Sequence, residues 1–269
     1  MKKEIFVRAG RLWLAGAALF VLRLLQLRSG FDENTGLALP SLPGRILWIL
    51  LLVCLAAEIF LCLRRPGGSK RSYACCFVPA EKPALGLLTA GSFLLMAGGA
   101  LLLIRALPPQ GTAAVTTAAA GALGIAGGAG LLLLGRELRN GGNPSQLPLL
   151  PVMFFSVLFV LAVYFPEESN PVLERFYLPV LAAAMAAYFL YQLSGFPRQE
   201  GSLRGFCFVG NAAVITCVAA AADCTGDPGR LLVYLGCAVL ATVFLLLVRK
   251  EPLPEPEENS EEAEEETRA

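Results

Sequence analysis

The sequence predicts an all-α fold, a polytopic membrane bundle of about eight transmembrane helices with both termini on the cytoplasmic side. Three observations lead to this prediction. The 269 residues are 56% apolar and only 16% charged, whereas an ordinary soluble domain is about 25% charged. The apolar residues form runs that approach or exceed the length a helix needs to cross a bilayer, about 20 residues. The basic residues gather in alternate connections between these runs.

Eight apolar runs account for the predicted spans, and together they form one helical domain over residues 1–248. In chain order the runs are 12–27, 46–63, 84–104, 113–134, 147–165, 176–193, 205–222 and 231–248. They are helices rather than barrel strands, because barrel strands are about 10 residues long and alternate polar with apolar residues. The connections between them are too short to build a soluble domain with its own core.

The first run is the weakest, because it is short and Arg23 lies one turn from its end. Basic residues precede it, as they precede the apolar core of a signal peptide. No small-residue cleavage site follows the run, which ends in Gln26-Leu27-Arg28. We therefore expect an uncleaved anchor, in which the long side chain of Arg23 extends outward to the membrane surface.

Charge sets the predicted orientation. If the eight runs alternate in direction, all but six of the 22 Lys and Arg residues fall on the side of the N-terminus. The six exceptions are Arg23, Arg28, Arg45, Arg105, Arg175 and Arg230. Lys and Arg accumulate in short cytoplasmic loops, so both termini are predicted to be cytoplasmic. The Ala-, Leu- and Gly-rich composition with short loops is typical of a bacterial protein of the cytoplasmic membrane.

Rows of small residues indicate where helices approach closely. Lipid is as apolar as leucine, so membrane helices associate through close packing and a few hydrogen bonds. Gly124 and Gly128 form such a row in the fourth run, Ala182 and Ala186 form one in the sixth, and the seventh contains another. These rows predict that the fourth, sixth and seventh helices are central, unless Gly and Ala are simply abundant here. The glycines of the fourth run are also compatible with a broken, substrate-binding helix.

Two polar residues lie deep inside predicted spans, Glu58 in the second and Asn211 in the seventh. An ionisable group at the membrane centre costs about 2.5–3.5 kcal/mol on insertion scales, so it suggests a functional role. Gln192 and Tyr191 lie nearer the same surface on the sixth run. If these helices adjoin, the four residues border a cytoplasm-facing polar site. Alternatively, Glu58 reaches water or a basic residue and Asn211 bridges two helices.

Familiar catalytic and metal chemistry is not indicated. The chain has no histidine, which removes the His-dependent triads, and its eight cysteines lack zinc-ribbon spacing. Cys75 and Cys76 lie in a basic connection, where nearby cations favour a reactive thiol, so redox or lipidation roles are open. We expect no enzyme activity, no cofactor, no metal and no nucleic-acid partner.

The last segment, residues 249–269, contains nine acidic and three basic residues. Such a segment is predicted to be disordered, and serves either as a solubilising tail or as an acidic docking strip for a basic partner. The first function hypothesis is a membrane-embedded scaffold or regulatory subunit that acts through partner contacts in the lipid bilayer. The second is a small-solute permease that uses Glu58 and Asn211. The weakest is an intramembrane enzyme.

Overall fold

The structure is a computed structural model, and it describes residues 2–31, 37, 39, 41–64, 70–107, 111–140, 144–167 and 172–249. Within this part of the chain, eight helices are long and apolar enough to cross a membrane. They are α1 (Lys2–Ser29), α2 (Leu42–Leu63), α4 (Lys82–Arg105), α5 (Gly111–Asn140), α6 (Leu150–Tyr164), α7 (Leu173–Gly195), α8 (Leu203–Ala220) and α9 (Pro228–Leu247). The all-helical, multi-pass prediction is therefore confirmed, while the acidic tail from residue 250 onward lies outside the described residues.

Several helices are longer than the apolar runs that predict them. α1 begins at Lys2 and α5 continues to Asn140, because a helix that has left lipid still satisfies its backbone hydrogen bonds internally. α6 is the exception, since its span includes a preceding 3-10 turn, η1 (Leu147–Leu149). α5 is one continuous helix of 30 residues, so its glycines do not break it.

Local capping explains where three of the helices begin. The side chains of Ser41, Ser202 and Asp227 each accept a hydrogen bond from the backbone N–H three residues later, at the starts of α2, α8 and α9. A side-chain acceptor at this position satisfies one of the unpaired amides of the first turn. α2 and α9 also have a proline in the first turn. The proline ring fixes φ at a helical value, and its missing N–H costs nothing because the first-turn amides have no acceptor within the helix.

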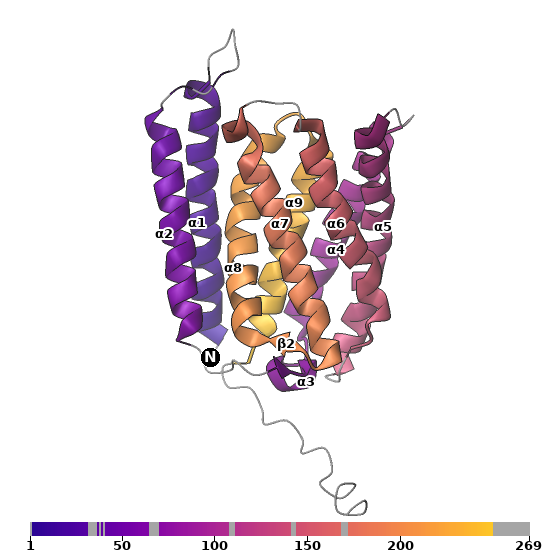
Figure 1. The fold of residues 1–269 in the computed structure, drawn as a ribbon. Helices are drawn as coiled ribbons and strands as arrows, with labels where there is room; N and C mark the ends of the chain where they lie inside the picture. The colour runs from indigo at the N-terminus through magenta and orange to yellow at the C-terminus, as the bar shows by residue number, and fades with distance from the viewer. Residues whose placement is uncertain are drawn as a thin grey trace, which may run out of the picture.

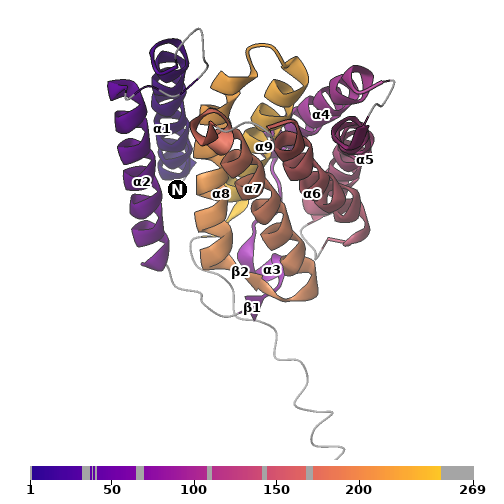
Figure 2. The ribbon, with the colours of Figure 1, turned by 45° about the horizontal axis from the view of Figure 1, so that its top comes forward.

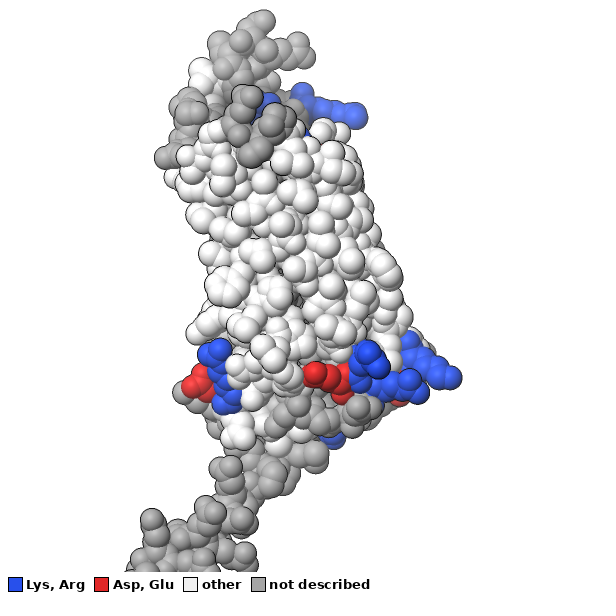
Figure 3. Space-filling model, turned by 90° about the vertical axis from the view of Figure 1, so that its right-hand side faces the viewer, with Lys and Arg blue, Asp and Glu red and all other residues white. Residues whose placement is uncertain are grey.

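Successive long helices run in opposite directions and form one bundle (Figure 1). We call the end where α1 begins and α9 ends the terminal end, and the other the opposite end. α1 and α2 form one side of the bundle and α4 and α5 the other, with α8 and α9 between them (Figure 2). The face beside α5 presents a belt of uncharged side chains between charged groups at both ends (Figure 3), as contact with a lipid bilayer requires.

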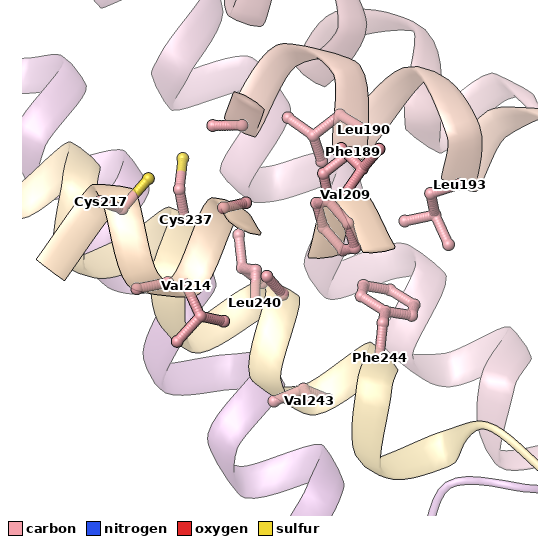
Figure 4. Packing of buried hydrophobic residues seen from close by; sticks show 14 of the residues in the cluster. Phe189, Leu190, Leu193, Val209, Val214, Cys217, Cys237, Leu240, Val243 and Phe244 are labelled. Carbon is pink, nitrogen blue, oxygen red and sulfur yellow. The ribbon is translucent and has the colours of Figure 1, made fainter. Parts of the chain in front are cut away.

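The core lies along α8, of which 15 of the 18 residues are buried. Phe189 of α7, Val209 of α8 and Phe244 of α9 meet there (Figure 4). Ala182 and Ala186 of α7 are also buried. The fourth helix differs from the prediction, since α5 lies at the edge of the bundle and α9 takes a central place.

Glycines bring the backbones of α4 and α5 together. A Cβ atom added to Gly121 would lie 2.7 Å from the carbonyl oxygen of Gly99, and one added to Gly99 would lie 2.7 Å from that of Gly121. Gly128 similarly faces the side chain of Met96, and Gly124 faces the ring of Phe155 on α6. The five glycines between Gly121 and Gly130 are all buried against neighbouring helices, so this part of α5 packs closely although the helix lies at an edge.

From Lys70 onward, the connection between α2 and α4 folds under the bundle. Strand β1 (Lys70–Arg71) pairs antiparallel with β2 (Gly201–Ser202), and the short helix α3 (Tyr73–Cys76) follows. The backbone N–H of Val78 donates to the carbonyl of Leu247 at 2.8 Å. Cys75 and Cys76 are consequently buried, so they lack the exposure that the sequence-based redox or lipidation hypothesis requires.

The close approach of α4 and α5 gives a testable prediction. Replacing Gly121 with Ala places a methyl group against backbone atoms that cannot rotate away, so we expect a loss of about 1–3 kcal/mol in stability. Gly86→Ala on α4 is the control, because nothing lies within 4 Å of a Cβ there. Thermal unfolding in mild detergent measures both variants. Equal melting temperatures for the two variants would contradict this account of the packing.

Candidate functional site

Two polar clusters inside the bundle connect α1 and α2 to the rest of the molecule. The terminal cluster consists of Arg11, Glu58 and Asn211. The opposite cluster consists of Arg23, Gln26 and Asp223, together with the backbone carbonyl of Arg175. Each cluster joins residues far apart in sequence, so neither could be assembled before the helices pack.

In the terminal cluster, the carboxylate of Glu58 on α2 accepts two hydrogen bonds. Arg11 Nη2 of α1 donates to Oε1 at 3.1 Å, and Asn211 Nδ2 of α8 donates to Oε2 at 2.6 Å. Glu58 is 4% exposed and Asn211 is fully buried, whereas the side chain of Arg11 is 55% exposed. The cluster therefore holds a buried anion whose counter-ion reaches the surface of the bundle.

Asn211 uses only part of its hydrogen-bonding capacity. Its Nδ2 atom donates to Glu58, but its Oδ1 atom is buried and has no hydrogen-bond partner within the part of the chain that the structure describes. A buried acceptor without a donor costs about 1–3 kcal/mol. The terminal cluster thus combines a satisfied carboxylate with one unsatisfied amide oxygen.

The other two predicted residues lie apart from this cluster. On α7, Gln192 Nε2 donates to the hydroxyl of Tyr188 at 2.9 Å. Tyr191 is 62% exposed, and its ring stacks against that of Tyr188. Of the four residues that the sequence singled out, the structure brings Glu58 and Asn211 together and places Gln192 and Tyr191 on an outward part of α7.

In the opposite cluster, Arg23 of α1 is fully buried. Its Nε atom donates to both carboxylate oxygens of Asp223, at 3.0 and 3.1 Å, and its Nη2 atom donates to Oδ1 at 2.7 Å. Its Nη1 atom donates to Gln26 Oε1 at 2.7 Å. The expectation that Arg23 extends to the membrane surface is wrong, because Asp223 in the turn after α8 provides a buried counter-ion.

A proline on α7 leaves a backbone carbonyl free to accept a hydrogen bond from Arg23. Pro179 lies inside α7 and has no N–H to donate to the carbonyl of Arg175 four residues earlier. Arg23 Nη2 donates to that carbonyl instead, at 2.8 Å. The guanidinium also lies 5.5 Å from the centre of the Tyr177 ring, which stacks on Trp48 of α2. Arg23 therefore joins α1, α7 and the end of α8 at one point.

The sequence contained part of the signal for the opposite cluster. Arg23 is a basic residue within a span, and Asp223 is an acid at the end of another span. An ionisable residue at membrane depth usually faces the bundle interior and has a partner. The pairing itself could not be inferred, because 200 positions separate the two residues.

A third polar group links α4, α6 and α9 at the opposite end. Asp227 Oδ2 accepts from Arg105 Nη1 at 2.6 Å, while Arg230 Nη2 donates to the carbonyl of Ala162 at 3.2 Å. The side chain of Arg105 is 60% exposed, and an exposed pair of this kind typically contributes about 0–1 kcal/mol. Among the described residues, no three His, Cys, Asp or Glu side chains gather where they could hold a metal ion.

Comparison with known proteins gives no match, neither to a family model, nor to a curated protein, nor to a solved structure. The class of the protein accordingly rests on its helices. Within the described residues, eight helices are long and apolar enough to cross a bilayer, so this is a multi-pass membrane protein in contact with lipid.

The opposite cluster predicts a large effect for one substitution. Asp223→Asn removes the carboxylate that accepts three hydrogen bonds from Arg23, so the buried guanidinium loses this counter-ion. We expect a loss of about 3–5 kcal/mol in stability. The control is Asp227→Asn, which keeps a good N-cap and loses ion pairs with Arg105 and Arg230, both of which are partly exposed arginines.

Thermal unfolding in detergent measures these two variants and a third, the double replacement Arg23→Met with Asp223→Leu. The double replacement should recover much of the loss, because apolar residues of similar size can substitute for a buried ion pair. If Asp223→Asn costs no more than Asp227→Asn, the buried pair does not hold α1 in place.

Proposed function

We propose that this multi-pass membrane protein is a membrane-embedded scaffold or regulatory subunit that acts through contacts with a partner protein. The proposal rests on one observation: the polar groups inside the spans form hydrogen bonds between helices. Arg23 donates to three different groups, and Glu58 is held by Arg11 and Asn211. These groups tie helices to one another. A transported solute would have to displace them before it could bind.

The α1–α2 pair offers a suitable surface for a partner. α2 packs against α1 and α8, and its outward side presents large exposed apolar side chains, among them Ile49, Val53 and Phe60. The two polar clusters fix the position of this pair at both ends. A rigidly held helix with an apolar outer side suits contact with the helix of another membrane protein.

The proposal includes an orientation and a location. We place both termini on the cytoplasmic side of the cytoplasmic membrane of a bacterium, because most basic residues lie toward the terminal end. The acidic tail, residues 249–269, would then be available to a basic cytoplasmic partner. In this role the chain carries out no catalytic step and needs neither a cofactor nor nucleic acid.

A small-solute permease is the second candidate, and one observation favours it. Asn211 Oδ1 is buried without a donor beside the carboxylate of Glu58, and Arg11 connects this cluster to the surface. Solute binding there would require Glu58 to release Arg11 or Asn211. Because both bonds help to hold α1 and α2 against α8, this candidate is less well supported than the scaffold.

The scaffold proposal predicts a specific cross-link. A photo-reactive residue at Val53 on α2 should capture a discrete protein, whereas one at Leu133, equally exposed on α5 across the bundle, should not. Deleting residues 251–269 should reduce the Val53 adduct several-fold, and the partner should co-purify with the full chain in mild detergent. Adducts with lipid alone at Val53, and no co-purifying protein, would contradict the proposal.

The orientation predicts which engineered cysteines react from outside the cell. Gly226→Cys lies exposed in the turn before α9 at the opposite end, and Arg198→Cys lies exposed after α7 at the terminal end. A membrane-impermeant maleimide on intact cells should label the first and spare the second. The unmodified chain is the control, because its eight cysteines are buried or half-buried. The reverse labelling pattern would invert the orientation.

A further inference from the structure

A groove opens between α4 and α5 at the terminal end. Its volume is about 210 Å³. Three leucines and a glycine form much of its wall, and two arginines and a threonine complete it. The lining residues are Leu85, Leu88, Thr89, Leu132, Gly135, Arg136 and Arg139. The groove is therefore apolar along one part and strongly basic at another.

The two arginines belong to the last turns of α5 and are exposed. Neither Arg136 nor Arg139 forms an ion pair within the part of the chain that the structure describes. The acid between them in sequence, Glu137, is engaged elsewhere, since its Oε2 atom accepts from the backbone N–H of Ser145 at 2.6 Å. Two positive charges thus lie at the groove without an ion-pair partner among the described residues.

The two helix ends at the groove have opposite partial charges. α4 begins at Lys82, so Leu85 and Leu88 lie in its first two turns, whereas α5 ends beside it at Asn140. The start of a helix carries a partial positive charge and its end a partial negative one, so the two effects oppose each other here. The preference of the groove for a negatively charged group therefore rests on the two arginines.

Gly135 lies close to the leucines of α4. A Cβ atom there would lie 3.1 Å from a methyl carbon of Leu88 and 3.9 Å from one of Leu85. Because Gly135 lines the groove, a larger side chain at this position would narrow it. The apolar part of the lining, which Leu85, Leu88 and Leu132 form, can contact a hydrocarbon chain.

We propose that the groove binds one anionic phospholipid, with the phosphate between Arg136 and Arg139 and an acyl chain along Leu85, Leu88 and Gly135. The groove lies on the side of the bundle whose uncharged belt meets a charged rim (Figure 3), where the headgroup region of a bilayer begins. Basic pockets between membrane helices bind such headgroups. A lipid uses both the arginines and the leucines, whereas a free phosphate would leave the leucine wall without a contact.

The test measures the affinity of the purified full-length protein in detergent for phosphatidylglycerol, with phosphatidylcholine as the uncharged reference, by native mass spectrometry. The double variant Arg136→Gln with Arg139→Gln should weaken phosphatidylglycerol binding roughly thirtyfold, since each basic residue near anionic lipid contributes about a five-fold factor. Phosphatidylcholine binding should change little.

The matched control removes two exposed charges at the same end but outside the groove, Arg64→Gln with Arg198→Gln. We expect this pair to keep the affinity of the unmodified chain. An equal loss in both pairs would show attraction by overall charge and would overturn the proposal.

Three further outcomes separate the possible occupants. Gly135→Leu should weaken binding with both arginines present, and Thr89→Phe at an exposed position fills the same groove if Gly135→Leu does not fold. Full affinity in a folded groove-filling variant would overturn the site.

Displacement of the lipid by excess inorganic phosphate would show an anion site only. Tighter lipid binding after deletion of residues 251–269 would identify the acidic tail as the occupant. Either result overturns the proposal.

Discussion

The pairing of Arg23 with Asp223 is the constraint on which the arrangement of the bundle depends. A charge inside a membrane needs a partner within the protein, because lipid provides none. Arg23 has no contact with solvent, and its donors reach Asp223, Gln26 and the carbonyl of Arg175. α1 can therefore lie in only one place, against the end of α8 and the start of α7. A proline in α7 supplies the free carbonyl that the last donor needs.

The terminal cluster holds the other end of the same pair of helices. Glu58 bridges α1 and α8 through Arg11 and Asn211, so α1 and α2 are fixed near both membrane surfaces. Between these points, Gly16 lets α1 approach α8 closely, because a Cβ atom there would lie 2.8 Å from that of Val218. Polar bonds thus set which helices meet, and small residues set how closely they approach.

The α4–α5 side of the bundle is held in a different way. Its helices meet through glycine backbones, and the arginines at its terminal end have no internal ion pairs among the described residues. At the terminal end, α1 and α2 thus use Arg11 and Glu58 for internal structure, whereas α5 leaves Arg136 and Arg139 exposed. This division connects the scaffold role proposed for α1 and α2 with the lipid site proposed between α4 and α5.

The sequence by itself determined the eight spans and their helical nature, because bilayer thickness and the absence of water fix the length and composition of each helix separately. It also identified Glu58 and Asn211 as unusual. It did not determine that Glu58 and Asn211, 153 positions apart, form a hydrogen bond, or that Arg23 is buried. Nor did it determine that α9 rather than α5 lies at the centre of the bundle. Only the tertiary structure decided these three features. The bilayer constrains the length and composition of each helix separately, whereas contacts between side chains on different helices determine which helices pack together.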